Sequence, residues 1–128
     1  DIQLNLETNL EEFFLDFDEN YMTEVTSNLL SNAIKFSNKN SEIAIKVSLD
    51  ENENLKTEII DSGKGIPKEE HHKLFNYFQR TTTQPTAGEH STGLGLAISK
   101  KIINEHNGTI DFISELNKGS NFYFVLKK

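Results

Sequence analysis

The chain has 128 residues, 35% of them hydrophobic and 26% charged, which is typical of one globular domain with a real core. It has no cysteine, which excludes a disulfide framework and thiolate chemistry. The net charge of −7 argues against a nucleic-acid surface, and no apolar run approaches the ~18 residues that a membrane span needs. Because it begins at Asp1 without a signal peptide or initiator Met, we expect a piece of a longer protein.

The first elements predicted are two strands and a helix. Ile2–Glu7 alternates apolar and polar residues, as a half-buried strand does, and the aromatic run Phe13–Phe17 is interpreted as a second strand. Asp18 then begins a group of residues that favour helix starts, and a helix is predicted from about Tyr21 to Phe36.

The middle of the chain predicts a hairpin, a short helix and a long loop. The hairpin joins strands at Ile43–Leu49 and Leu55–Ile60 through an acidic turn. Pro67 is expected in the first turn of a short helix over Lys68–Phe75. Residues 76–92 are polar and lack periodicity, and so long a loop in a compact domain is usually functional, often a lid.

The last third predicts a helix over Gly95–His106 with a C-cap at Asn107–Gly108, followed by strands at Thr109–Ser114 and Asn121–Leu126. Three helices and about six strands, joined by hairpins rather than by repeated βαβ units, indicate an α+β fold built as a two-layer sandwich.

Two glycine-rich turns carry the strongest functional signal. Asp61–Pro67 follows a predicted strand and begins with an acid, whereas Ser91–Ile98 opens into a helix. Glycines let the backbone approach a ligand closely, and a helix N-terminus offers unpaired N–H groups to an anion. The pair indicates a nucleotide, with its base bound by the acid and its phosphates by the glycines.

The helix over Tyr21–Phe36 has a polar stripe along the border of its apolar face. The stripe consists of Glu24, Asn28, Asn32 and Lys35. Amide oxygens suit Mg²⁺, and a lysine can bind a phosphate. A solvated face with hydrogen bonds between successive turns explains the same stripe without a ligand, so the stripe alone leaves both interpretations open.

Five ordered segments resemble the motifs of sensor histidine kinases, and the resemblance covers essentially the whole chain. They are an asparagine box at Asn28–Phe36, a first glycine box at Asp61–Pro67, a phenylalanine box at Leu74–Arg80, a second glycine box at Ser91–Ile98 and a closing glycine segment at Lys118–Phe122. The resemblance implies that residues 1–128 form one catalytic domain with the Bergerat ATP-binding fold. That fold is a mixed, mostly antiparallel sheet with about three helices on one face and an ATP lid.

The resemblance also implies a site for ATP and Mg²⁺. Asn32 would coordinate the metal with the help of Asn28, and Asp61 would accept a hydrogen bond from the exocyclic amine of adenine. Lys35 would contact the phosphates and Arg80 would reach the γ-phosphate, so these two are the implied catalytic residues. The other implied ATP contacts are Phe36, Gly63, Gly65, Ile66, Thr92, Gly93, Leu94, Gly95, Leu96 and Ser120.

Some positions depart from the family pattern. His90 and Ser91 stand where relatives often have glycine, which predicts a stiffer or differently shaped lid; His90 itself is interpreted as an exposed loop residue. Asn28 aligns with the acid that activates water in related ATPases. Because an amide is no general base, phosphoryl transfer is favoured over hydrolysis, with Glu24 as a weaker candidate base.

The family phosphorylates a histidine that lies on a separate dimerisation domain and is usually followed by an acid. None of His71, His72, His90 and His106 precedes an acid, and the first two are expected on an exposed helix face. The implied partners are therefore a histidine-containing dimerisation domain and, indirectly, a response regulator receiver domain, with no nucleic acid and no direct membrane insertion. The domain is expected to be cytoplasmic, within a parent protein that can be membrane-anchored.

Two other functions are compatible with the same sandwich. The family-like phenylalanine box, with Phe78, Gln79 and Arg80 at its end, disfavours a protein serine kinase of the anti-sigma type. A regulatory pseudokinase module is disfavoured because the chemically important residues are retained, namely Asn32, Lys35, Asp61 and Arg80.

Overall fold

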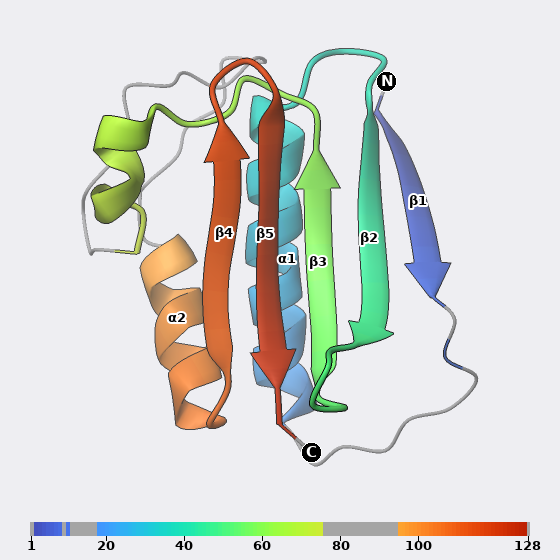
Figure 1. Cartoon of the computed structure of the whole chain (residues 1–128), viewed down its shortest axis with the longest axis vertical. Coiled ribbons are helices and arrows are strands. Elements are labelled where there is room, and N and C mark those ends of the chain that lie inside the picture. The colour runs from blue at the N-terminus through green and yellow to red at the C-terminus, as the bar shows by residue number, and fades with distance from the viewer. Residues whose placement is uncertain (1, 9, 11–17, 76–94, 128) are drawn as a thin grey trace.

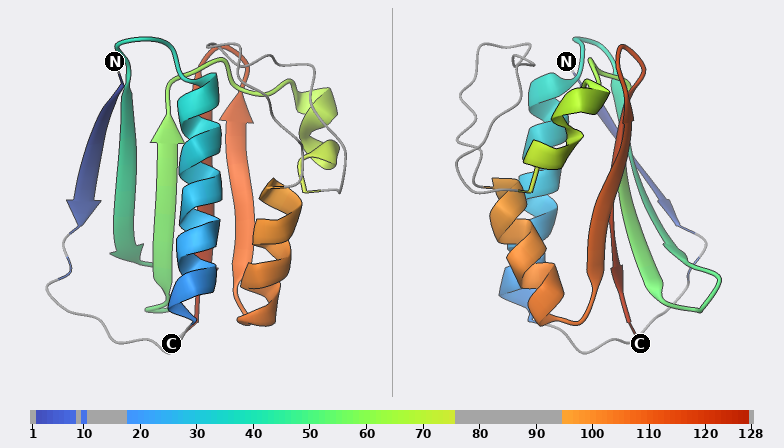
Figure 2. Two further views of the ribbon diagram at one scale, coloured as in Figure 1. Left: turned by 180° about the vertical axis from the view of Figure 1, so that it is seen from behind. Right: turned by 60° about the vertical axis from the view of Figure 1, so that its left-hand side comes forward.

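The computed structural model describes residues 2–8, 10, 18–75 and 95–127 and shows one sheet with the helices on a single face (Figures 1 and 2). The elements are β1 (Gln3–Thr8), α1 (Glu19–Phe36), β2 (Glu42–Leu49), β3 (Leu55–Asp61), the 3₁₀-helix η1 (Lys68–Lys73), α2 (Gly95–Glu105), β4 (Thr109–Glu115) and β5 (Gly119–Leu126). The strand order is β1-β2-β3-β5-β4; β1 pairs parallel with β2, and the other neighbouring strands pair antiparallel. The predicted α+β sandwich is confirmed.

None of the described helices combines the length and the apolar character that crossing a membrane requires.

The helix α1 begins at Glu19, two residues before the predicted start, and ends at Phe36 as predicted, because its cap and its apolar stripe favour the same segment. Asp18 is the N-cap, and its carboxylate accepts hydrogen bonds from the backbone N–H groups of Asn20 and Tyr21 at 3.0 and 3.2 Å. The buried face, at helical spacing, consists of Met22, Val25, Leu29 and Ala33. Capping therefore sets where the helix begins, and burial of this stripe orients it on the sheet.

We expect Asp18→Ala to lower the free energy of unfolding by about 1 kcal/mol, because a lost N-cap leaves first-turn N–H groups without their acceptor. Urea denaturation would measure the loss, with Asp18→Asn as the control because it keeps an acceptor oxygen. An equal loss in both variants would mean that the negative charge, rather than the cap, stabilises the helix.

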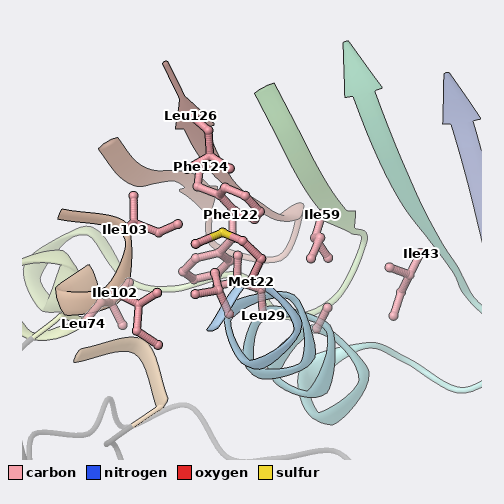
Figure 3. Packing of buried hydrophobic residues seen from close by; sticks show 12 residues of the cluster. Met22, Leu29, Ile43, Ile59, Leu74, Ile102, Ile103, Phe122, Phe124 and Leu126 are labelled. Atoms are coloured by element: carbon pink, nitrogen blue, oxygen red, sulfur yellow. The ribbon is translucent and has the colours of Figure 1, made fainter. Parts of the chain in front are cut away.

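The core lies between the sheet and the two α-helices (Figure 3). Ile59 of β3 and Phe122 of β5 are cross-strand partners and pack in one cluster with Leu29 of α1. The contribution of α2 is Ile102 and Ile103. Because the helices cover one face only, the inward-facing residues of the central strands are buried and their neighbours in sequence are half-exposed.

The predicted hairpin and C-cap are confirmed. β2 and β3 pair antiparallel up to Leu49 and Leu55, next to the connecting turn. α2 ends at Glu105, one residue earlier than predicted. Asn107 then takes the left-handed conformation at φ 60°, and the Gly108 N–H donates to the Ile103 carbonyl at 2.9 Å. The Asn107 N–H also donates to the Asn104 carbonyl at 3.1 Å. Together these two bonds form a Schellman motif, in which asparagine occupies the position more often held by glycine.

The short helix differs from its prediction. It is a 3₁₀-helix that ends at Lys73 rather than Phe75, and Pro67 is its N-cap residue rather than part of its first turn. The Glu70 N–H donates to the carbonyl oxygen of Pro67, three residues earlier in the chain. Such hydrogen bonds define a 3₁₀-helix, which is common in short helical segments.

The described part of the chain forms five strands, at the places of five of the six predicted ones. The strand predicted at Phe13–Phe17 and the loop predicted at 76–92 lie outside that part.

Candidate functional site

Three polar side chains form a row across one end of the sheet. In the antiparallel register Asp61 of β3 pairs with Ser120 of β5, and Ser120 pairs with Ser114 of β4. The next row on the same face belongs to the core or packs on it, and consists of Ile59, Phe122 and Phe112. Since side chains two residues apart point to the same face, the polar row lies under the helices. The apolar core thus ends in a carboxylate and two hydroxyls.

Asp61 is a buried acid, with 7% of its surface exposed. Burial raises the pKa of Asp61 above its ordinary value of 3.8, while backbone hydrogen bonds from Gly63 and Ser120 act in the opposite direction. The Gly63 N–H donates to Oδ1 at 2.9 Å. A buried carboxylate with so few donors around it can accept further hydrogen bonds from a ligand, and such perturbed groups are concentrated at functional sites.

The loop after β3 is packed between α1 and the β4–β5 turn. A Cβ on Gly63 would lie 2.1 Å from the carbonyl oxygen of Phe36, the last residue of α1. Gly65 has a φ of +69°, and a Cβ there would lie 2.1 Å from the Glu115 carbonyl oxygen. The glycines were predicted to let the backbone pass under a base. Packing within the chain is enough to require glycine at both positions, because a side chain at either one would clash with a backbone carbonyl.

Two residues outside the predicted set complete this end of the site. Gly119 has a φ of +101°, and a Cβ there would lie 2.1 Å from the carbonyl oxygen of Asp61. The Ser114 hydroxyl accepts a hydrogen bond from the Ile66 N–H at 2.8 Å and so anchors the loop after β3. Gly119 lies in a segment that the motif comparison had singled out, whereas Ser114 is apparent only once the strand register is known.

The polar stripe of α1 borders the apolar face of the helix, as predicted. Asn28, Asn32 and Lys35 are half-buried, whereas Glu24 is exposed. The Asn28 Nδ2 donates to the Gly95 carbonyl oxygen and to the Ser99 hydroxyl, both at 3.3 Å. Asn28 therefore connects the middle of α1 to the first turn of α2.

The two glycine-rich turns thus meet the same helix at two places. Asn28 contacts Gly95 at the end of the second turn, and Phe36 contacts Gly63 in the first. Eight residues of α-helix separate these contacts, a distance of about 12 Å. The part of α1 between them carries Asn32 and Lys35, so an amide and an ammonium group lie along the helix between the loop after the buried acid and the start of α2.

The other residues predicted to contact ATP fall into three groups. Ile66 and Leu96 are partly buried and pack against the core. Gly95 opens α2, and a Cβ there would meet Asn28 only at an ordinary 3.5 Å, so packing does not require glycine. The remaining predicted residues lie outside the described part of the chain, namely Arg80, Thr92, Gly93 and Leu94, together with His90 and Ser91.

The expectation that His71 is exposed was wrong. Its ring is half-buried, with Nε2 at 3.0 Å from the Ile66 carbonyl oxygen and its edge against Phe112 at a centroid distance of 4.9 Å. The tight turn of η1 brings this ring over the edge of the sheet. His72 is exposed, as predicted.

Residues 17–128 match the family described as histidine kinase-, DNA gyrase B- and HSP90-like ATPase. Sensor protein SrrB of Staphylococcus aureus is 38% identical over 129 aligned positions, which include 100% of this chain and 22% of SrrB. The chain therefore spans about a fifth of the length of this relative.

Solved structures share the same arrangement of strands and helices. The catalytic domain of histidine kinase ThkA, in a nucleotide-free form, is 33% identical, with a TM-score of 0.83 over 99% of this chain and 80% of that domain. Full-length ShkA in complex with AMPPNP is 22% identical, with a TM-score of 0.80 over 99% of this chain and 26% of ShkA. The fold is therefore that of histidine kinase catalytic domains.

Proposed function

Since the chain belongs to the family of histidine kinase-, DNA gyrase B- and HSP90-like ATPases, we propose that it binds ATP with Mg²⁺ and donates the γ-phosphate to a histidine of a separate dimerisation domain. The observation that carries this proposal is the position of α1, which meets the loop after the buried acid Asp61 at Phe36 and the first turn of α2 at Asn28, with the polar stripe between these two contacts. The stripe offers cation and phosphate ligands between a base site and a helix N-terminus.

The base end of the site fits adenine. Asp61, when ionised, has only acceptor atoms, and it accepts hydrogen bonds from the backbone N–H groups of Gly63 and Ser120. Each carboxylate oxygen has two lone pairs, so the carboxylate can also accept from the exocyclic amine of adenine. Guanine has a carbonyl oxygen at that position, which would face the carboxylate without a proton between them. The site should therefore prefer ATP to GTP.

The phosphate end fits a triphosphate and its cation. Asn28 uses its amide nitrogen on the Gly95 carbonyl, which leaves its amide oxygen as the group for a hard cation; Asn32, one turn further along α1, offers a second amide. When bound, Mg²⁺ would offset the negative charge of the phosphates. Lys35, in the last turn of α1, would bind a phosphate oxygen as a point charge.

Phosphoryl transfer needs charged residues of this domain and an acceptor histidine from a separate domain. The bond between the γ-phosphorus and the β–γ bridging oxygen breaks while a bond to the acceptor imidazole nitrogen forms, and ADP leaves. Lys35, and Arg80 from outside the described residues, would balance the charge that develops on the phosphoryl oxygens. The acceptor would come from a separate domain of a longer kinase, as in the sensor protein that the chain resembles, with a response regulator receiver domain as the later partner.

Titration calorimetry with a non-hydrolysable ATP analogue, with and without Mg²⁺, tests the metal assignment. We expect wild-type affinity to fall by about 10–100-fold without Mg²⁺, and Asn32→Ala to have the same weak affinity in both conditions, because a lost metal ligand removes the benefit of the cation.

Asn104→Ala, which removes an exposed amide at the far end of α2, is the matched control and should keep the wild-type response to Mg²⁺. A full Mg²⁺ response in Asn32→Ala would exclude Asn32 as a ligand. Failure of the folded wild-type domain to bind any adenine nucleotide would reject the kinase proposal in favour of a regulatory module.

A further inference from the structure

We propose that Ser99 is a positioning residue that holds the side-chain amide of Asn28 against α2, so that Asn28 offers its amide oxygen to the cation and withholds its amide nitrogen from the phosphates. This inference deepens the proposed function and rests on it. It comes from a buried hydroxyl of α2 that the proposed binding and transfer do not use.

Ser99 is a polar residue on the buried face of α2. It is 0% exposed, and the other buried residues of this helix are Ala97, Ile102 and Ile103. The two α-helices lie side by side (Figure 2), and Nδ2 of Asn28 on α1 is 3.3 Å from the Ser99 hydroxyl oxygen. Buried hydroxyls are rarely left without a partner, and here the partner is a side chain of the candidate site.

The Gly95 carbonyl decides which atom of the Asn28 amide faces α2. This carbonyl oxygen also lies 3.3 Å from Nδ2, and a carbonyl oxygen only accepts hydrogen bonds. The opposite orientation of the amide would place Oδ1 against the carbonyl oxygen, with no proton between the two atoms. Nδ2 therefore faces α2, and because an amide NH₂ group only donates, the Ser99 hydroxyl accepts from it.

Two acceptors one turn apart on α2 thus hold the amide. The two contacts are equally long, so neither dominates and the loss of either should be measurable. With Nδ2 committed to α2, the oxygen is the amide atom of Asn28 that remains for a ligand. An amide oxygen suits Mg²⁺, whereas a phosphate oxygen would need the nitrogen as its donor. Asn28 is therefore assigned to the cation, and Ser99 acts through it.

Nuclear magnetic resonance of the nucleotide-free domain tests the contact itself. The NH₂ protons of Asn28, identified by their absence in Asn28→Ala, should exchange with solvent about tenfold faster in Ser99→Ala, because one of two acceptors is lost. Ser99→Ala removes one atom and introduces a good helix former, so the variant should fold. Thr57→Val, which removes a buried hydroxyl from β3, is the matched control and should leave these protons unchanged. Wild-type exchange in Ser99→Ala would overturn the inference.

Calorimetry with ADP, with and without Mg²⁺, tests the consequence for binding. Ser99→Ala should reduce the gain in affinity that Mg²⁺ gives by about fivefold and leave the affinity without Mg²⁺ within about twofold of the wild type, as expected for one lost hydrogen bond at a cation ligand. Thr57→Val should keep both wild-type affinities.

Equal weakening of ADP binding with and without Mg²⁺ in Ser99→Ala would overturn the inference, because Ser99 would then only support the packing of α2. An unchanged gain from Mg²⁺ would overturn it as well. Either result leaves ATP binding standing. A wild type that binds no ADP would instead reject the proposed function, and with it the cation assigned to Asn28, even where resonance shows that Ser99 holds the amide.

Discussion

Asp61→Asn should remove detectable ATP binding, a loss of at least about 100-fold, and still leave a folded domain. In the wild type, Oδ1 of Asp61 accepts the Gly63 N–H at 2.9 Å. An asparagine would keep that bond through its amide oxygen and turn its NH₂ group toward the base. That group would meet the amine of adenine, so two donors would face each other with no acceptor between them.

The same reasoning predicts that Asp61→Asn changes the preference between ATP and GTP rather than weakening both nucleotides equally. An NH₂ group at this position can donate to the carbonyl oxygen of guanine, so GTP should lose much less affinity than ATP, or gain some. Calorimetry with both nucleotides measures the ratio. Asp111→Asn is the matched control because its carboxylate also accepts a backbone N–H, from Phe112 at 2.8 Å, but lies exposed outside the site. A variant that retains wild-type ATP affinity would exclude Asp61 as the base ligand.

Asp61→Asn should also raise the free energy of unfolding near neutral pH, because it removes a buried charge. Burial raises the pKa of Asp61 above 3.8, so the folded state binds its proton more tightly than the unfolded state does. The stability linked to that proton is fully present below pH 3.8 and is lost as the pH rises through the raised pKa. Asparagine carries no such charge, so the difference between variant and wild type should grow over that pH range.

ATP affinity and folding stability should depend on pH in opposite directions. The proposed contact with adenine needs the ionised carboxylate as an acceptor, so wild-type ATP affinity should fall as the pH drops through the raised pKa of Asp61. Denaturation and calorimetry across mildly acidic pH would measure both effects. If stability differed by the same amount at every pH, titration of Asp61 would not be its cause.

Gly119→Ala should destabilise the domain by about 3–5 kcal/mol and weaken nucleotide binding with it. The φ of +101° is strained for any residue with a Cβ, and that atom would lie 2.1 Å from the Asp61 carbonyl oxygen. Backbone cannot yield as a flexible side chain would, so β5 and β3 must move apart where Asp61 and Ser120 pair. Asp61, the proposed ligand of the base, and Ser120 would then be displaced.

Thermal or urea denaturation measures the loss, and Gly95→Ala is the control. At Gly95 the nearest atom to an added Cβ belongs to Asn28 at 3.5 Å, an ordinary contact, so stability should be unchanged or slightly higher. Wild-type stability in Gly119→Ala would show that β5 accommodates a side chain at this turn.

The elements themselves were predictable because they depend on neighbours in sequence. The cap at Asp18, the apolar stripe that runs from Met22 to Ala33, and the stop after α2 at Asn107 each involve residues within a few positions of one another. Local hydrogen bonding and helical periodicity are enough to place such features. The polar stripe with Asn28 and Asn32 was predictable for the same reason, although its purpose was not.

The candidate site was predictable only in part. The resemblance to histidine kinases singled out Asp61 and the glycines, but the ligand contacts expected of them remain predictions. His71 was misplaced because its exposure depends on Phe112, which is distant in sequence and meets it only when η1 packs against β4. No local pattern in η1 contains that information.

By itself, the sequence determined which segments become helices and strands, which faces are apolar, and that an acid and two glycine-rich turns accompany a polar helix stripe. Only the tertiary structure decided that Ser114 joins Asp61 and Ser120, and that Gly119 must lack a side chain. The physical reason is strand register. Pairing of β3, β5 and β4 places side chains from three distant segments in one row, and hydrogen bonds between them exist only after the sheet has formed.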